Sequence, residues 1–170
     1  MITKTVFPRR YIQGEGALLQ LGAEAARLGK HAFILCSPSA FKEIVPVIEK
    51  PVLKEVKATF EKFGRECCDR GIERVTKAAQ QAGADVMIGI GGGKALDTAR
   101  IAAGKLGLPV INVPTIAATD APTSAVSVVY SEDGVFDRVI ILSSNPQAVL
   151  VDTGVIAKAP VRFLVSGMGD

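Results

Sequence analysis

The sequence predicts an α/β fold in which a parallel β-sheet carries helices on its faces, accompanied by a β-hairpin. Three continuous apolar runs, at residues 31–36, 85–90 and 110–113, have the pattern of strands buried on both faces. Segments with helical spacing of apolar residues lie between them, and this alternation is typical of a parallel sheet. With 170 residues, 48% of them hydrophobic, the chain is long enough to bury one sizeable core.

The first half of the chain adds three predicted helices and one predicted strand to the buried runs. Residues 17–28 have apolar side chains at helical spacing. Residues 41–49 are compatible with a helix, although Pro46 lies inside them. Residues 52–60 alternate sufficiently to predict a strand, and residues 73–81 again predict a helix.

The second half begins with a predicted helix over residues 94–105, which leads into the third buried run. Residues 124–130 and 138–142 are rich in β-branched residues and flank a Glu-Asp-Gly sequence at residues 132–134, which predicts a hairpin. The remaining predicted elements are a short strand at residues 149–151 and a helix over residues 158–168.

Composition excludes several classes of protein. Twenty Lys and Arg against 17 Asp and Glu give a net charge of +3, spread along the chain without the interleaved aromatic residues of a single-strand binder, so we expect no nucleic-acid partner. No stretch approaches the ~20 apolar residues of a membrane helix, and no targeting signal opens the chain. Three cysteines without CxxC spacing fit a reducing compartment, and we expect a cytoplasmic protein with no membrane partner.

The sharpest local feature is a glycine triplet, Gly91, Gly92 and Gly93, followed by Lys94. It lies between a predicted strand and a predicted helix, where glycines let a phosphate approach the backbone and the helix N-terminus offers free N–H groups. The Rossmann pattern requires Gly in place of Lys94, and a P-loop requires Ser or Thr in place of Ala95. We interpret the segment as a phosphate-binding loop, and the alternative is a turn that permits tight packing of strand and helix.

Two further polar features accompany this loop. Asp97 is predicted in the first turn of the helix, either as a ligand or as a carboxylate favoured by the helix dipole. Residues 114–124 follow the third buried strand, at the sheet edge where α/β proteins bind ligands. Their hydroxyls are candidates for sugar binding, and Asp120 for holding a substrate hydroxyl. Alternatively, Thr119 and Asp120 satisfy only backbone groups of a turn.

Other catalytic chemistries have no support in the sequence. His31 is the single histidine, so the chain does not by itself complete a three-ligand catalytic zinc site. No GxSxG motif occurs, and the adjacent thiols Cys67 and Cys68 have no histidine nearby in sequence. Neither hydrolytic nor thiol catalysis is predicted.

Two long motifs resemble the glycerol dehydrogenases of the iron-containing (group III) alcohol dehydrogenase superfamily, to which dehydroquinate synthase is related. They are Gly-Gly-Gly-Lys-Ala-Leu-Asp-Thr-Ala at residues 91–99 and Pro-Thr-Ile-Ala-Ala-Thr-Asp-Ala-Pro at residues 114–122. Shorter matches extend the resemblance over essentially the whole chain. The resemblance implies a Rossmann-like NAD-binding domain over residues 1–160, the N-terminal domain of a dehydroquinate synthase-like fold. Residues 161–170 would begin a truncated, helical, metal-binding C-terminal domain.

The resemblance also implies which residues form the site. The implied NAD-binding residues are Gly92, Gly93, Lys94 and Asp97 at the glycine loop, Thr115 and Ala118 on the nicotinamide side, and Ser124, Val126 and Tyr130 on the following strand. Asp120 matches the residue that contacts the polyol substrate. Asp170 matches a ligand of the catalytic metal, zinc or iron, whose two histidine ligands in the family lie beyond the end of this chain.

By this resemblance, the complete enzyme is a homo-oligomer that oxidises a small polyol such as glycerol, giving dihydroxyacetone, with NAD as acceptor. We expect the chain alone, without the C-terminal domain, to be inactive. The alternatives are a glycerol-1-phosphate dehydrogenase, a dehydroquinate synthase-like enzyme and a non-catalytic nucleotide-binding module.

Two departures from the family pattern affect the cofactor site. Many members have an acidic residue that meets the adenosine ribose at the end of the second strand, where this chain has Cys36 and Ser37. Because an acidic group there repels a 2′-phosphate, its absence argues against a strict preference for NAD over NADP. Ala118 replaces a common serine and removes one hydroxyl contact.

Overall fold

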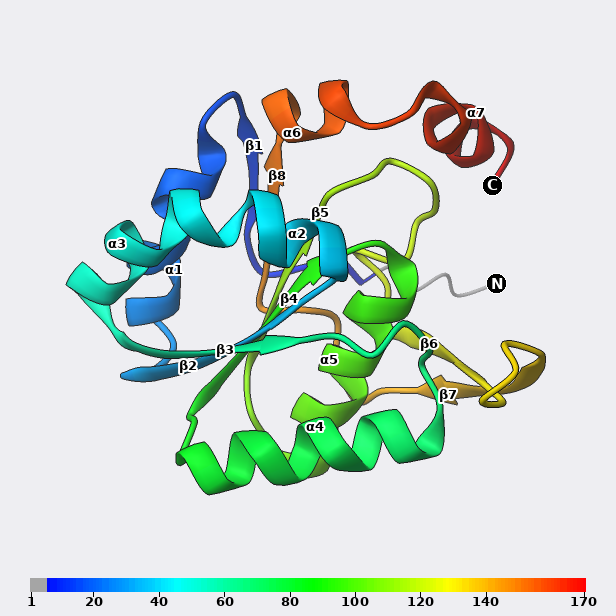
Figure 1. The fold of residues 1–170 in the computed structure, drawn as a ribbon, viewed down its shortest axis with the longest axis horizontal. Coiled ribbons are helices and arrows are strands. Elements are labelled where there is room, and N and C mark those ends of the chain that lie inside the picture. The colour runs from blue at the N-terminus through cyan, green and yellow to red at the C-terminus, as the bar shows by residue number, and fades with distance from the viewer. Residues whose placement is uncertain (1–5) are drawn as a thin grey trace, which may run out of the picture.

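The computed structural model describes residues 6–170 and contains a six-stranded sheet and a two-stranded hairpin (Figure 1). The strands are β1 (Tyr11–Gly14), β2 (His31–Cys36), β3 (Lys57–Lys62), β4 (Val86–Gly91), β5 (Val110–Pro114), β6 (Val126–Tyr130), β7 (Phe136–Ile141) and β8 (Ala148–Asp152). The helices are η1 (Ala17–Gln20), α1 (Leu21–Ala26), α2 (Pro38–Glu43), α3 (Val45–Glu55), α4 (Asp69–Ala82), α5 (Gly93–Leu106), α6 (Thr153–Lys158) and α7 (Val161–Gly169). The large sheet has the order β1-β8-β5-β4-β2-β3, and all its strand pairs are parallel.

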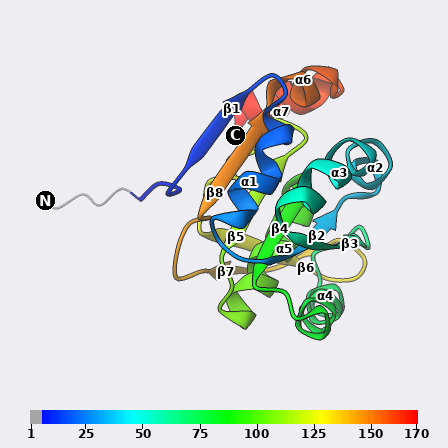
Figure 2. The same ribbon diagram turned by 90° about the vertical axis from the view of Figure 1, so that its left-hand side faces the viewer.

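Helices cover both faces of the large sheet (Figure 2). On β2, Ile34 belongs to the core that includes Ile48 of α3, whereas Phe33 belongs to the opposite core, with Val75 of α4 and Ala99 of α5. All residues of β2 and β4 are buried because each strand has a helix layer on either side. The three continuous apolar runs are therefore neighbouring strands inside the sheet, and the prediction of a parallel α/β fold is confirmed.

The carboxyl ends of the central strands meet at one edge of the sheet. Backbone hydrogen bonds tie these ends together, from the Ser37 N–H to the Ile90 carbonyl (2.8 Å) and from the Thr115 N–H to the Gly91 carbonyl (3.1 Å). Helices α2, α5 and α6 begin at this edge, each directly after a strand (Figure 1). The polar loops predicted to carry the site consequently lie side by side.

Two predicted boundaries in the first half are wrong. The structure has two helices over residues predicted as one, because α2 ends at Glu43 and Pro46 lies in the first turn of α3, where its missing N–H is not needed. The strand predicted over residues 52–60 is shifted to β3. Val52 belongs instead to α3 and is fully buried one turn after Ile48, on the side of the helix that packs on the sheet.

The second half follows the prediction more closely. Strands β6 and β7 form the predicted antiparallel hairpin, whose turn contains Gly134 in the left-handed region (φ 81°). The helix predicted over residues 158–168 is divided into α6 and α7 at Pro160, which cannot continue a preceding helix. The domain boundary expected at residue 160 stays a prediction.

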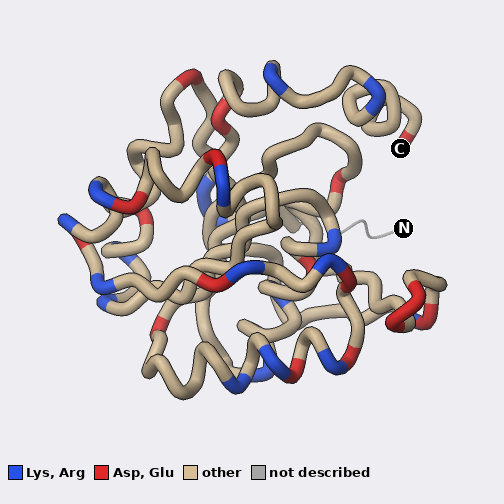
Figure 3. The backbone as a smooth tube through the Cα atoms, viewed as in Figure 1, with Lys and Arg blue, Asp and Glu red and all other residues tan. Residues whose placement is uncertain are grey.

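Charged residues of both signs are interspersed along the backbone (Figure 3). The acidic residues of the hairpin, Glu132, Asp133 and Asp137, are exposed. Within residues 6–170, no helix combines the length and the apolar character that crossing a membrane requires.

His31, at the start of β2, makes stability depend on pH. Burial, together with the nearby charge of Lys57, lowers the pKa of His31 below its usual 6.5, and its Nε2 hydrogen-bonds Thr59 Oγ1 at 2.9 Å. The unfolded chain therefore takes up this proton at a higher pH than the folded chain does. We expect the free energy of unfolding to fall as the pH is lowered through 6.5 towards the pKa of the folded state.

Urea titrations at pH 7.5 and 5.5 measure this dependence. The free energy of unfolding should differ less between the two pH values in His31→Gln than in the unchanged chain, because glutamine keeps a hydrogen-bonding group and does not titrate. An unchanged difference in His31→Gln would contradict the assignment.

Candidate functional site

The glycine triplet is a tight connection between β4 and α5. Gly91 has a φ of 153°, and a Cβ at this position would lie 2.8 Å from Ser37 Cβ. A Cβ on Gly92 would lie 2.9 Å from Ile116 Cδ1. Both glycines thus allow neighbouring loops to approach the backbone, as the tight-packing interpretation requires.

Gly93 differs because a Cβ there would clash with no neighbouring atom. A Cβ on Gly93 would come no closer than 3.9 Å to Ala121 Cβ and 4.0 Å to Thr119 Oγ1. Gly93 is the first residue of α5, and no side chain of the described residues caps this helix at its N-terminus. Free N–H groups, the positive end of the helix dipole and a missing side chain together suit an anionic group such as a diphosphate.

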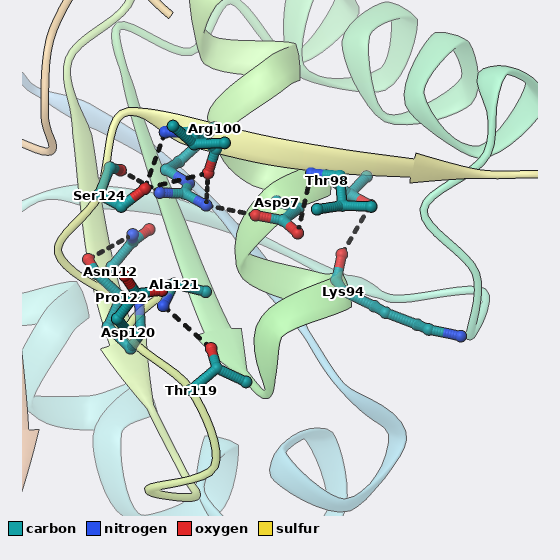
Figure 4. Close-up of polar contacts among 12 residues, drawn as sticks. Lys94, Asp97, Thr98, Arg100, Asn112, Thr119, Asp120, Ala121, Pro122 and Ser124 are labelled. Atoms are coloured by element: carbon teal, nitrogen blue, oxygen red, sulfur yellow. Dashed lines mark hydrogen bonds and ion pairs between the residues drawn. The ribbon is translucent and has the colours of Figure 1, made fainter. Parts of the chain in front are cut away.

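Lys94 points away from Thr119 (Figure 4). Its Nζ donates to Glu66 Oε2 at 2.6 Å and lies 4.6 Å from the centre of the Tyr130 ring. The structure therefore brings together two of the expected cofactor residues, Lys94 and Tyr130, and adds Glu66, which the sequence analysis does not identify.

Asp97 lies in the second turn of α5, so its prediction as a first-turn carboxylate is wrong. It forms a buried ion pair with Arg100, and its Oδ2 accepts the Val128 N–H at 3.3 Å (Figure 4). Burial raises the pKa of Asp97, against the opposing effect of the Arg100 charge. The carboxylate faces the hairpin strand β6, and its contacts tie α5 to that strand.

Three buried or half-buried side chains hold the end of the loop after β5 by its carbonyl groups. Arg100, 1% exposed, donates to the carbonyls of Ser124 and Val126, the latter at 2.7 Å. Asn112 Nδ2 donates to the Pro122 carbonyl (2.9 Å), and Asn145 Nδ2 donates to the Thr123 carbonyl (2.7 Å). The backbone of residues 122–126 is fixed in this way.

Ser124, Val126 and Tyr130, the residues implied to contact the cofactor beyond the loop, lie on β6 or just before it. Val126 and Tyr130 occupy alternate positions of β6 on its more exposed face, opposite the buried Ser127 and Val129. Ser124 stands just before this strand, and its Oγ accepts the Val126 N–H at 2.8 Å.

Asp120 is exposed and lies beside Asp170, whose Oδ2 accepts the Asp120 N–H at 3.0 Å. Helix α7 reaches this loop because Gly167 has no side chain, since a Cβ there would lie 2.2 Å from the Ala117 carbonyl oxygen. Ala118 lies at the same contact, where its carbonyl accepts a hydrogen bond from Ser166 Oγ at 3.4 Å. The predicted substrate residue and the predicted metal ligand are therefore neighbours.

Two cavities flank the loop after β5. The first, about 720 Å³, lies between α2, α3 and α6 and includes Thr115 and Ser39 in its lining. The second, about 430 Å³, is lined by hydroxyl and carboxylate groups of Thr119, Asp120 and Thr123, together with apolar residues of β8 and α6. The described residues that line the second cavity include no lysine or arginine.

The end of β2 carries no negative charge. Cys36 is fully buried, and burial raises the pKa of its thiol to about 12, so the thiol is neutral at physiological pH. Ser37 caps α2, with its Oγ accepting the Ala40 N–H at 3.3 Å, and lies 3.3 Å from Ser39 Oγ. Hydroxyl groups therefore stand where many relatives are expected to have a carboxylate.

The residues present do not complete a metal site. Over residues 6–170, no group of three or more His, Cys, Asp or Glu side chains is arranged to hold a metal ion. The carboxylate of Asp170, the implied metal ligand, accepts a hydrogen bond from the backbone N–H of Asp120.

Four residues that organise this site are not among those that the sequence predicts. They are Glu66, Arg100, Asn112 and Asn145. Only Arg100 carries a usable local signal, because it lies among apolar residues of a helix three positions after Asp97, which is the spacing of an intrahelical ion pair.

Comparison with known proteins gives one family. The model of the iron-containing alcohol dehydrogenases matches residues 8–153. Glycerol dehydrogenase from Thermotoga maritima is 48% identical over 170 residues, which are all of this chain and 46% of that protein. Glycerol dehydrogenase from Citrobacter freundii is 42% identical over 164 residues, 96% of this chain and 45% of that protein.

The solved structures agree with this result. The crystal structure of a probable glycerol dehydrogenase from Sinorhizobium meliloti is 43% identical in sequence and superposes with a TM-score of 0.92, covering 99% of this chain and 46% of that chain. The chain thus spans about half the length of the relatives that it matches.

Proposed function

The chain belongs to the iron-containing alcohol dehydrogenase family, and we propose that it is the NAD-binding part of a polyol dehydrogenase that oxidises glycerol to dihydroxyacetone. The observation that carries the proposal is the glycine triplet at the end of β4, which leads into a helix without a side-chain cap, where no side chain at Gly93 blocks access to the helix N-terminus. The similarity to glycerol dehydrogenases over the whole chain supports the substrate class.

In this proposal the chain's own residues bind and orient the two reactants. The N-terminus of α5 holds the cofactor diphosphate through the backbone N–H groups of Gly93 and Lys94. Bound NAD supplies the acceptor for the hydride that leaves the carbinol carbon. Asp120 accepts a hydrogen bond from a substrate hydroxyl in the second cavity, where Thr119 and Thr123 offer further hydroxyls.

Because the described residues do not complete a metal site, we derive no step through a metal. The relatives are about twice as long as this chain, and we propose that a C-terminal domain supplies the zinc or iron ligands that accompany Asp170. On this proposal the 170-residue chain alone does not oxidise glycerol.

The end of β2 supports binding of NADP as well as NAD. Cys36 is neutral and Ser37 and Ser39 offer hydroxyls, so none of these three side chains repels a 2′-phosphate. We propose that the affinities for NADH and NADPH differ by less than about tenfold, which is 1.4 kcal/mol.

A titration of NADH and NADPH into the chain, followed by nicotinamide fluorescence, tests the proposal. We expect saturable binding of both. Gly93→Val should weaken NADH binding by about tenfold or more, because its side chain fills the space beside the helix N-terminus. Gly14→Ala is the control, since a Cβ at Gly14 meets no atom within 4 Å and lies at the end of β1.

Two outcomes would overturn the proposal. One is the absence of saturable binding by a chain whose circular dichroism shows a folded α/β protein. The other is equal affinity of Gly93→Val and Gly14→Ala for NADH.

A phosphorylated substrate, as in a glycerol-1-phosphate dehydrogenase or a dehydroquinate synthase-like enzyme, is disfavoured by the second cavity. Its described lining residues carry no positive charge to pair with a phosphate. Rates with glycerol and with glycerol phosphate, measured on the whole protein that carries this segment, separate these alternatives. A non-catalytic nucleotide-binding module would bind NADH and turn over neither substrate.

A further inference from the structure

The proposed function places the backbone N–H of Lys94 at the cofactor diphosphate, and the ammonium group of the same residue already has an anionic partner in the protein. Its Nζ lies 2.6 Å from Glu66 Oε2, and the two side chains are 39% and 29% exposed. The Tyr130 ring, 4.6 Å from the same Nζ, supports the ammonium group from a second side. The lysine is held beside the hairpin, away from Thr119 (Figure 4).

The segment that carries Glu66 is held in a strained conformation. Arg65, the residue before Glu66, has a φ of 91°, and it is the one residue other than glycine with a positive φ among residues 6–170. Such a conformation is unfavourable for a residue that has a side chain, and it persists where the surroundings fix it. The residue after Glu66 provides an anchor, because Cys67 is fully buried and its carbonyl accepts the Tyr130 N–H at 2.8 Å.

The hairpin turn passes beside the Glu66 carboxylate. A Cβ built on Gly134 would lie at an ordinary contact distance, 3.6 Å, from the carboxylate oxygens. The turn at Arg65 and the anchor at Cys67 fix the backbone on either side of Glu66. Its carboxylate therefore lies beside Lys94 at the start of α5. An exposed, freely rotating glutamate would need none of these constraints.

We infer that Glu66 tunes the affinity of the cofactor site, because its carboxylate competes with the cofactor diphosphate for the Lys94 ammonium group and so lowers the affinity for an anionic cofactor. This inference rests on the proposed function. An ammonium group paired at 2.6 Å with a carboxylate must leave or share that partner to bind a phosphate oxygen. The carboxylate that remains nearby repels the incoming negative charge.

Glu66→Gln tests the inference, because glutamine keeps the size and a hydrogen-bonding group of glutamate and removes the charge. We expect Glu66→Gln to bind NADH about three- to tenfold more tightly than the unchanged chain in the fluorescence titration. Glu61→Gln is a matched control, since Glu61 also is 29% exposed and also pairs with a basic side chain, Arg74, outside the site. Its affinity for NADH should stay unchanged.

A second background shows whether Glu66 acts through Lys94. Lys94→Met should weaken NADH binding, and the gain caused by Glu66→Gln should be smaller in Lys94→Met than in the unchanged chain. An equal gain in both backgrounds would overturn the competition for Lys94.

The failure of this inference differs from the failure of the proposed function. If the unchanged chain binds NADH and Glu66→Gln binds equally or more weakly, the inference is wrong and the proposed function stands. If the unchanged, folded chain does not bind NADH and Glu66→Gln does not bind it either, both are wrong.

Discussion

Replacing Arg100 by methionine is expected to lower the free energy of unfolding by about 3–5 kcal/mol. Arg100 is 1% exposed, and its guanidinium donates to the Asp97 carboxylate and to the carbonyls of Ser124 and Val126. Methionine fills a similar volume but leaves a buried carboxylate and two buried or half-buried carbonyls without these donors. Removing one partner of a buried ion pair costs more than the pair itself contributes, because the remaining charge stays in a poorly solvated environment.

Urea unfolding of the variant and of a surface control measures this effect. Arg138→Met removes an exposed pair with Asp69, whose side chains are 44% and 64% exposed, and should lower the free energy of unfolding far less than Arg100→Met. The double variant Asp97→Asn with Arg100→Met should lose less stability than the two single losses added together. If Arg100→Met lowered the free energy of unfolding by less than about 1 kcal/mol, the contacts of Arg100 would not be what holds α5 and β6 together.

The fold was predictable where a local pattern reports the surroundings of a strand. β2, β4 and β5 are continuous apolar runs because helices cover both faces of the sheet. Each run can therefore be predicted as a buried strand from its own residues. The strand β1 is absent from the predicted elements, since four residues at a half-exposed edge of the sheet leave only a weak pattern. The strand predicted over residues 52–60 begins inside α3 because Val52 and Val56 suit a helix face and a strand equally well.

The candidate site was predictable where the backbone restricts the residue type. Gly91 needs a positive φ, and Gly92 needs room for Ile116, so the triplet is visible in the sequence. Glu66 was not identifiable in this way, because its role depends on contact with Lys94, 28 residues further along the chain. Pairings of this kind are set by the packing of β3, α5 and the hairpin, and no local pattern records them.

The second large effect is expected in the glycine triplet, where substitutions at Gly91 and at Gly93 should act on different properties. Gly91→Ala is expected to lower the free energy of unfolding by about 3 kcal/mol, from backbone strain at a φ of 153° and from a Cβ placed 2.8 Å from Ser37 Cβ and 3.0 Å from Ala95 Cβ. Relief of these contacts requires a shift of Ser37 before α2, of Ala95 in α5, or of the Gly91 backbone itself. A shift of the Gly91 backbone would also disturb its carbonyl, which accepts the Thr115 N–H at 3.1 Å.

Gly93→Ala separates the requirements of the fold from those of cofactor binding. A Cβ at Gly93 meets nothing closer than 3.9 Å, and alanine suits a helix better than glycine, so urea unfolding should show no loss of stability. Gly91→Ala should therefore lose both stability and NADH binding, whereas Gly93→Ala should keep its stability and weaken only the binding. Equal stability of the two variants would mean that the triplet does not need a positive φ at Gly91. Unimpaired NADH binding by Gly93→Ala would place the diphosphate away from the first residue of α5.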